Sequence, residues 1–282
     1  MDKIKAPVNR IIPFSAVDGP GNRTAVFLQG CNIDCKYCHN PETRALCTGC
    51  GACVAKCPAG ALTMTEGRVH FDAAKCVQCD TCIHICPNDA SPRILWMTAE
   101  EAVNAIKKQM PFIRGVTVSG GECTLYPEFL TELFISCREL GLHTLIDSNG
   151  MVDFAQYPEL MAVTDGVMLD IKAFQEEDHV RVTGCSNSQV LQNAAFLARS
   201  GKLTEIRTVV VPELFDAEQV IFDIARFLQD KTDLSKLRYK LIAFRPFGVR
   251  SIYQKFESPD AAYMQELYEK AVQAGFLDII LI

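Results

Sequence analysis

The chain has 282 residues, 49% of them hydrophobic, which is enough for one large domain or a large domain with a small insert. Its 28 lysines and arginines against 34 aspartates and glutamates form no basic block, so we expect no nucleic-acid partner. No apolar run approaches the roughly 20 residues of a membrane helix, and no signal peptide precedes the first motif, so no membrane partner is expected either.

The first expected element is a buried strand over residues 24–29, and three cysteines follow it, at Cys31, Cys35 and Cys38. The spacing Cys-x3-Cys-x2-Cys supplies only three thiolates, so a four-iron cluster bound there keeps one iron without a protein ligand. An open metal position is where substrate chemistry takes place, as in catalytic zinc sites with three protein ligands. The pattern predicts a reactive cluster at the C-terminal end of a strand.

Two four-cysteine runs come next, each with the spacing Cys-x2-Cys-x2-Cys-x3-Cys-Pro of bacterial ferredoxins. In such a run three thiolates bind one cluster and the fourth binds the neighbouring cluster. The predicted ligand sets are Cys47, Cys50, Cys53 and Cys86 for one [4Fe–4S] cluster and Cys76, Cys79, Cys82 and Cys57 for the other. Residues 47–92 would then form a ferredoxin-like insert, and residues 1–46 and 93–282 the main domain.

Zinc is the main alternative for the Cys-x2-Cys pairs, but the duplicated regular runs favour iron–sulfur clusters. A disulfide framework is not expected, because a chain of this length buries a core without staples. Thiolate-bound clusters persist where the surroundings are reducing and oxygen is scarce, so we expect a cytoplasmic protein of anaerobic metabolism. Cys123, Cys137 and Cys185 have no assigned ligand role, and Cys137 is expected to be a small core residue.

After the cysteine runs, helical and strand-like segments alternate. Thr98 and Glu101 form a capping box for a helix through Lys108. Further strands are expected over 116–118, 144–146, 167–171, 205–211 and 240–244, and helices over 127–140, 188–200 and 216–228, the last capped by Asp216 and Gln219. About six βα units fit, so the expected α/β fold is an incomplete (β/α)6 barrel, with a doubly wound sheet as the alternative.

Polar or glycine residues follow three of these strands, in the segments 119–122, 147–150 and 170–172. Taken singly, Ser-Gly-Gly and Ser-Asn-Gly are ordinary turns. At three successive strand ends, on the side of the sheet where the open cluster is expected, they predict a ligand-binding site.

These motifs together resemble those of radical SAM enzymes, and more closely those of glycyl-radical-enzyme activating enzymes related to pyruvate formate-lyase activase. The resemblance covers residues 11–250. It rests on the segments 18–24, 31–42, 119–122, 147–150 and 168–172, and on Arg207 before Val209-Val210-Val211-Pro212. The ferredoxin insert resembles that of the subclass with two extra clusters, and the amino-acid sequence of the motifs as a whole resembles that of the YjjW-type members.

The resemblance implies an activase that reductively cleaves S-adenosylmethionine (SAM) to a 5'-deoxyadenosyl radical and abstracts a hydrogen atom from a backbone glycine of a partner glycyl radical enzyme. It implies three [4Fe–4S] clusters, SAM and a monovalent cation as cofactors, a flavodoxin or ferredoxin as reductant, and a monomer as the default state. Implied catalytic residues are Cys31, Cys35, Cys38, Asp18 and Lys172. Implied SAM contacts are Tyr37, His39, Asn40, Gly120, Gly121, Glu122, Ser148, Asn149, Asp170, Lys172 and Arg207. Implied cation ligands are Asp147, Ser148, Met168 and Asp170.

Ordinary explanations stay open for several of these residues. Asp170 and Lys172 could form a surface ion pair worth under ~1 kcal/mol, Asp18 could cap a turn, and Arg207 could be a solvated strand residue. Arg245 stands where the related activase has a histidine, and an arginine cannot act as a proton switch. The segment 181–184 matches the Arg-Val-x-Gly of glycyl radical loops, which we interpret as coincidence.

Three other functions compete with the activase. A radical SAM enzyme that acts on a small metabolite would share every cofactor motif. An iron–sulfur electron carrier would account for the two ferredoxin runs and leave Cys31, Cys35 and Cys38 without a role. A zinc-binding interaction module would account for the paired cysteines alone.

Overall fold

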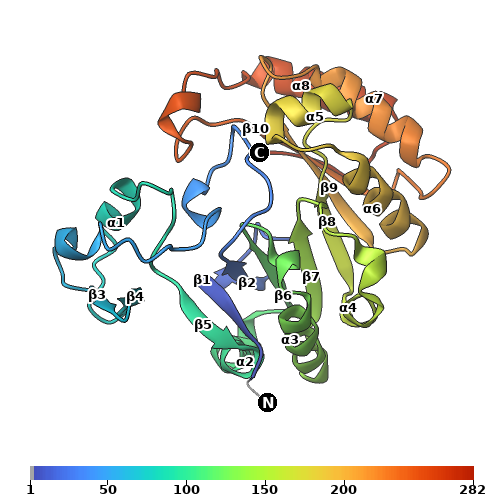
Figure 1. The fold of residues 1–282 in the computed structure, drawn as a ribbon. Helices are drawn as coiled ribbons and strands as arrows, with labels where there is room; N and C mark the ends of the chain where they lie inside the picture. Colours follow the sequence, from blue (N-terminus) through green and yellow to red (C-terminus); the bar gives the residue numbers. More distant parts are fainter. Residues whose placement is uncertain (1–2) are drawn as a thin grey trace. The chain divides into compact units, whose positions relative to one another are not determined.

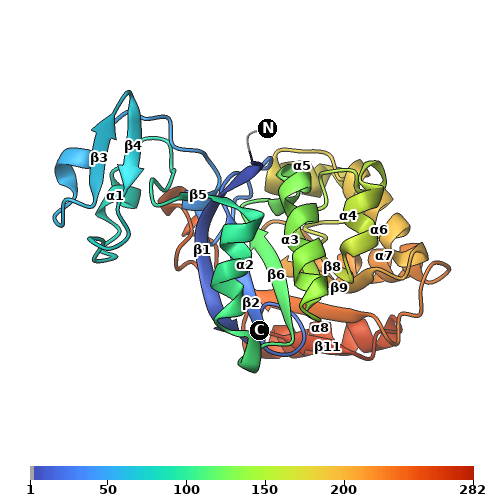
Figure 2. The same cartoon turned by 90° about the horizontal axis from the view of Figure 1, so that it is seen from below.

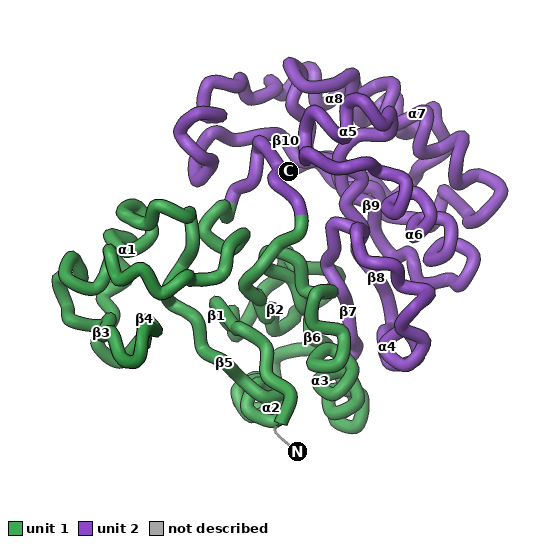
Figure 3. Tube along the Cα trace, viewed as in Figure 1, with its two compact units in different colours: residues 1–32, 40–142 green, residues 33–39, 143–282 purple. Residues whose placement is uncertain are grey.

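The computed structural model describes residues 3–282, and the contacts within the chain divide it into two compact units (Figure 3). Unit 1 contains the chain up to residue 32 and residues 40–142, and unit 2 contains residues 33–39 and 143–282. The insert predicted over residues 47–92 falls inside unit 1, and its boundaries stay a prediction. Cys31 therefore belongs to unit 1, and Cys35 and Cys38 belong to unit 2.

Unit 1 contains a sheet in the order β6-β2-β1-β5, of which only β2 and β6 were expected. Its strands are β1 (Lys5–Ser15), β2 (Arg23–Leu28), β5 (Leu95–Thr98) and β6 (Gly115–Gly120). Strands β2 and β6 run parallel, and β1 runs antiparallel to both β2 and β5. Apolar side chains such as Val26 and Val118 are fully buried, because every second residue of a strand faces the same side.

Two helices pack on each other in unit 1, α2 (Ala99–Lys107) and α3 (Pro127–Glu139) (Figures 1 and 2). The predicted capping box is confirmed, because the Thr98 hydroxyl accepts from the Glu101 amide and the Glu101 carboxylate accepts from the Thr98 amide. Cys137 is fully buried in α3, as expected, and burial raises the pKa of its thiol to about 12. Cys123 is also buried, and its Sγ donates to the carbonyl of Val118 at 3.3 Å.

The cysteine-rich segment contributes a separate two-stranded hairpin and one short helix to unit 1. The hairpin pairs β3 (Leu62–Thr65) with β4 (Arg68–Phe71), and the helix is α1 (Thr81–His84). Both views show these elements away from α2 and α3 (Figures 1 and 2). Most of this segment has no regular secondary structure. Contacts of individual side chains, and not a large apolar core, must therefore fix its conformation.

Unit 2 contains five parallel strands in the order β7-β8-β9-β10-β11. The strands are β7 (His143–Ser148), β8 (Gly166–Asp170), β9 (Leu203–Val210), β10 (Arg238–Ala243) and β11 (Ile279–Leu281). The helices are α4 (Pro158–Val163), α5 (Glu176–Thr183), α6 (Ser188–Arg199), α7 (Ala217–Leu228) and α8 (Ala261–Gln273). Helix α6 contacts β9, α8 contacts β10, and α7 contacts both α6 and α8, outside the strands (Figure 1).

The predicted α/β class with parallel strands is confirmed. The six strands expected from the sequence correspond to β2 and β6 in unit 1 and to β7, β8, β9 and β10 in unit 2. Strands β6 and β7 extend two residues beyond their predicted ends, to Gly120 and Ser148, and β8 ends at Asp170, one residue before its predicted end. Asp216 caps α7 as expected, but Gln219 donates to Asp223 instead of completing a reciprocal cap. Within residues 3–282 no helix has the length and apolar character needed to cross a membrane.

Candidate active site

Backbone pairing holds the loop that carries Cys31 at the C-terminal end of β2. The amide of Gly30 donates to the carbonyl of Thr43 at 2.8 Å, and the amide of Cys31 donates to the carbonyl of Arg44 at 2.8 Å. The buried Gln29 amide group donates to two further carbonyls of the same return segment, at 2.6 and 2.7 Å. Hydrogen bonds from residues 29, 30 and 31 therefore hold the backbone in place at Cys31, the first predicted ligand.

The glycines after β6 are required because the backbone approaches its neighbours closely. A Cβ at Gly120 would lie 2.1 Å from the carbonyl oxygen of Leu28, and Gly120 also has a φ of +126°. A Cβ at Gly121 would lie 2.2 Å from the carbonyl oxygen of Gly30. The sequence suggested a close approach to a ligand, whereas these contacts are between two segments of the chain. They place the end of β6 directly against the loop of Cys31.

Glu122 is buried at the end of this segment and is held on several sides. Its carboxylate accepts from the amide and the hydroxyl of Thr124, at 3.1 and 2.6 Å. Its own amide donates to the carbonyl of Gly30 at 2.6 Å. The carboxylate is thus oriented before any ligand binds.

The loop with Asp18 is fixed by a buried arginine. Arg23 donates to the hydroxyl of Thr117 and to the carbonyl of Val116, both at 2.7 Å, and the same hydroxyl donates to the carbonyl of Asp18 at 2.6 Å. The carboxylate of Asp18 accepts from the Ser15 hydroxyl at 2.5 Å. Asp18 therefore makes the local turn contacts of the ordinary explanation, and its contact with a partner protein stays a prediction.

In unit 2 the loop of residues 33–39 pairs with the end of helix α5. The amides of Asp34 and Lys36 donate to the carbonyls of Thr183 and Val182, both at 3.0 Å. The segment 181–184, interpreted above as a coincidental match, has this structural role. The amide of Cys38 closes the loop by donating to the carbonyl of Cys35 at 3.2 Å.

A second segment, residues 244–250, contacts the same loop. His39 stacks on Phe244 with ring centroids 6.2 Å apart, and its Nε2 lies 3.0 Å from the carbonyl oxygen of Arg245. Burial lowers the pKa of His39, so the ring is neutral at pH 7. Arg250 donates to the carbonyl of Cys35 at 3.0 Å and pairs with Asp34 at 2.6 Å. No sequence motif indicated a role for Arg250, and the side chain of Arg245 is exposed.

Tyr37 and Lys172 lie together beside the cysteine loop. The Tyr37 ring is buried, the Lys172 Nζ lies 5.9 Å from its centroid, and the phenol oxygen has no hydrogen-bond partner among the described residues. Lys172 pairs with Asp170 at 2.8 Å, with 12% and 26% of the two side chains exposed, so the surface-pair alternative is wrong. Burial alone would lower the pKa of Lys172, but Asp170 and the Cys35 thiolate outweigh it and raise this pKa. Lys172 is a buried ammonium group.

Arg207 lies in a buried network of charges on strands β7, β9 and β10. It pairs with Asp147 at 2.8 Å and with Glu205 at 2.5 Å, and 11% of its side chain is exposed, so the solvated-residue alternative is wrong. Glu205 also pairs with Lys240 at 3.0 Å, and both side chains are buried. Glu205 and Lys240 were missed from the sequence. Charged residues in an otherwise apolar strand are the signal that could have found them.

The remaining predicted ligand residues follow these strands or lie within them. The Nη2 of Arg207 lies 3.0 Å from the Sδ of Met168, and Met168 is the register neighbour of Asp147. Ser148 and Asn149 are buried, and each side chain accepts a backbone amide two residues on, at 2.9 Å. In the described part of the chain no three thiolate, imidazole or carboxylate groups converge on a single ion position, and the monovalent-cation site stays a prediction. In unit 1, the carbonyl of Asn40 accepts from Thr43.

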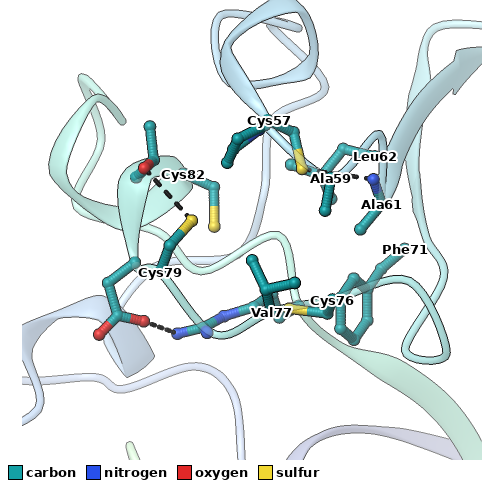
Figure 4. A pocket seen from close by; sticks show the side chains of 13 residues that line it. Cys57, Ala59, Ala61, Leu62, Phe71, Cys76, Val77, Cys79 and Cys82 are labelled. Atoms are coloured by element: carbon teal, nitrogen blue, oxygen red, sulfur yellow. Dashed lines mark hydrogen bonds and ion pairs between the residues drawn. The ribbon is translucent and has the colours of Figure 1, made fainter.

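A cavity in the cysteine-rich segment is lined by Cys57, Cys76, Cys79 and Cys82 (Figure 4). These four cysteines are the predicted ligand set in which one run lends its last thiolate to the other. Apolar side chains line the rest, among them Leu62, Phe71 and Val77. The amides of Ala61 and Gln78 donate to the sulfurs of Cys57 and Cys76 at 3.3 and 3.4 Å, as the amides around iron–sulfur clusters do. The residues present fit a four-thiolate cluster.

Three of the four other predicted ligands, Cys47, Cys53 and Cys86, also lie near one another. Cys53 is buried, and burial raises the pKa of its thiol, with the neighbouring thiolates of Cys47, Cys82 and Cys86 raising it further. The amide of Ala90 donates to the sulfur of Cys86 at 3.4 Å. A metal cluster with its positive irons would remove this mutual repulsion of thiolates.

Comparison with known proteins identifies similar chains. Residues 25–224 match the family model described as the radical SAM superfamily. The chain is 34% identical to the indoleacetate decarboxylase activating enzyme of Tractidigestivibacter scatoligenes over 80% of this chain and 79% of that protein. It is 32% identical to the 4-hydroxyphenylacetate decarboxylase activating enzyme of Clostridioides difficile over 94% and 91%. The crystal structure of QueE from Escherichia coli has a similar fold, with a TM-score of 0.55 at 14% identity, over 99% of this chain and 94% of that one.

Proposed function

This chain belongs to the radical SAM superfamily and to its glycyl-radical-enzyme activating enzymes, and we propose that Cys31, Cys35 and Cys38 hold its catalytic [4Fe–4S] cluster. The family implies a glycyl radical enzyme as the protein partner. When bound, such a cluster offers an open iron to SAM and the electron that yields methionine and a 5'-deoxyadenosyl radical, which takes a hydrogen atom from the partner's glycine. The placement of Cys31 at the end of β2, in a loop fixed by Gly30 and Thr43, carries the proposal.

The buried cations of unit 2 bind and orient the methionine end of SAM. Lys172 is an ammonium group with 12% of its side chain exposed, and Arg207 is a guanidinium with 11% exposed. A ligand carboxylate that meets these cations avoids the cost of an unpaired buried charge. Asp170 and Asp147 hold the two cations in place, and a monovalent cation beside Asp147, Ser148, Met168 and Asp170 would offset the added negative charge.

Other side chains receive the amino and adenosine groups. Glu122 is a buried carboxylate beside Gly120 and Gly121, and it accepts the ligand's ammonium group. The neutral ring of His39, with Tyr37 and Asn40, lies against the adenosine, and Ser148 and Asn149 complete the contacts. Burial of Tyr37, Glu122, Ser148 and Asn149 limits the access of water, so the reactive carbon meets the target C–H bond and not solvent. Asp18, in the loop fixed by Arg23, contacts the incoming glycine segment of the partner.

The cysteine-rich segment holds two further [4Fe–4S] clusters and relays electrons from a flavodoxin or ferredoxin. The cavity lined by Cys57 together with Cys76, Cys79 and Cys82 supports this assignment, because the ligands come from both runs, as in two-cluster ferredoxins. Each cluster accepts one electron without a change of ligands. The relay delivers a low-potential electron to the catalytic site.

Replacing one catalytic ligand tests the assignment of the first cluster. Cys35→Ala should abolish 5'-deoxyadenosine formation from SAM under dithionite, while the absorbance of the two insert clusters persists. Cys137→Ala is the matched control, because that thiol is buried in α3 away from every motif, and it should leave SAM cleavage unchanged. Continued cleavage by the Cys35→Ala protein would disprove the assignment.

Electron paramagnetic resonance tests the activase reaction itself. The reconstituted protein, SAM and a co-encoded glycyl radical enzyme should give a glycine-centred doublet under anaerobic reduction. SAM cleavage without a doublet from any co-encoded partner would favour an enzyme that acts on a small metabolite. Intact clusters without SAM cleavage would favour an electron carrier, and an iron-free protein after anaerobic purification would favour a zinc module.

A further inference from the structure

Arg93 reaches the cavity that we assign to one insert cluster. It lines this cavity together with Cys76 and Cys82, and 21% of its side chain is exposed. Its guanidinium pairs with Asp80 at 2.6 Å. An arginine keeps its positive charge at every relevant pH. A permanent cation therefore stands at the wall of one predicted cluster site.

The charge of Arg93 is only partly neutralised on the side that faces the cysteines. Asp80 is half exposed, so water screens its negative charge, whereas Arg93 is mostly buried. Arg93 and Asp80 both line the cavity, and the more buried Arg93 is the less screened of the two charges. Nearby charge is one of the levers by which a protein sets an iron–sulfur potential.

We propose that Arg93 raises the reduction potential of the cluster held by Cys57, Cys76, Cys79 and Cys82. Reduction adds one negative charge to a cluster, and a fixed cation stabilises that charge. The cluster beside Arg93 therefore takes an electron from an external one-electron donor more readily than it would without this cation, and no bond forms or breaks in this step. This inference rests on the proposed function, because it requires an insert cluster in this cavity.

Redox titration of the reconstituted protein, followed by electron paramagnetic resonance, tests the inference. Arg93→Gln should weaken reduction of one cluster about tenfold, which for a one-electron couple is a midpoint about 59 mV more negative. Asp80→Asn should move the same midpoint in the positive direction, because it removes the acid that offsets Arg93. Arg93→Lys should retain most of the wild-type midpoint. The signal that moves should be the one that Cys79→Ala removes.

Lys75→Gln is the matched control in the same segment. Lys75 pairs with Asp72 at 3.3 Å, 61% of its side chain is exposed, and it does not line the cavity. Its replacement should move neither midpoint. If Arg93→Gln and Asp80→Asn leave both midpoints unchanged while iron and sulfide analysis finds three clusters, the inference about Arg93 is wrong and the proposed function stands. If the wild-type protein binds fewer than three clusters, the proposed two-cluster insert is wrong instead.

Discussion

Glu205 is the residue whose replacement should most clearly reveal the buried charge network of unit 2. Its carboxylate has 2% of its side chain exposed and contacts two cations, Arg207 at 2.5 Å and Lys240 at 3.0 Å. In Glu205→Gln the two cations stay buried, and Asp147 remains to pair with Arg207. Removing one partner of a buried ion pair costs ~3–5 kcal/mol, because an uncompensated charge is left in a poorly solvated place.

Urea unfolding followed by far-ultraviolet circular dichroism, under anaerobic conditions, measures this loss. With a urea dependence of ~3 kcal/mol per M, the unfolding midpoint should fall by ~1–1.7 M. Glu218→Gln is the matched control, because Glu218 pairs with Lys270 at the same kind of distance, 2.8 Å, with 41% of its side chain exposed. Exposed pairs contribute ~0–1 kcal/mol, so the control midpoint should hardly move.

A charge-balanced double variant separates lost charge from lost packing. Glu205→Gln combined with Lys240→Met removes one charge of each sign, and replacing a whole buried pair is often neutral. The double variant should therefore recover much of the stability that Glu205→Gln loses. A single-variant loss no larger than that of Glu218→Gln, or a double variant as unstable as the single one, would refute the reasoning.

Two further predictions concern close packing. Gly121→Ala should cost about 3 kcal/mol in urea unfolding, since its Cβ would meet the Gly30 oxygen at 2.2 Å. In Gly141→Ala the new Cβ would meet nothing within 4 Å and only the φ of +73° would be unfavourable, so a loss in Gly121→Ala no larger than in Gly141→Ala would count against this contact. Cys137, whose pKa burial raises to about 12, should resist iodoacetamide at pH 8 in the native protein, because only about one thiol in 10⁴ is ionised there, and should react after unfolding. Labelling of native Cys137 would show that the α3 core is open.

Several elements were predictable because their determinants are local. The capping box of Thr98 and Glu101 lies within one turn, so its four-residue pattern is sufficient to place the start of α2. Strands β2 and β8 contain the continuous apolar runs 25–28 and 167–169, which is typical of strands buried on both faces. Strands β1 and β5 were not predicted. Their residues are mixed in polarity, and their pairing with β2 and with each other is long-range.

By itself, the sequence predicted the ligand chemistry, because a cysteine spacing within one loop limits which thiolates can share a cluster. The spacing rule of ferredoxin runs also predicted that Cys57 belongs with Cys76, Cys79 and Cys82. In the structure these four cysteines line one cavity. Only the tertiary structure decided that Glu205 bridges Arg207 and Lys240, that Arg250 contacts the loop of Cys35, and that Arg93 lines the same cavity as Cys76. Side chains from separate segments become neighbours only once strand register and loop packing are set, and no local pattern encodes that distance.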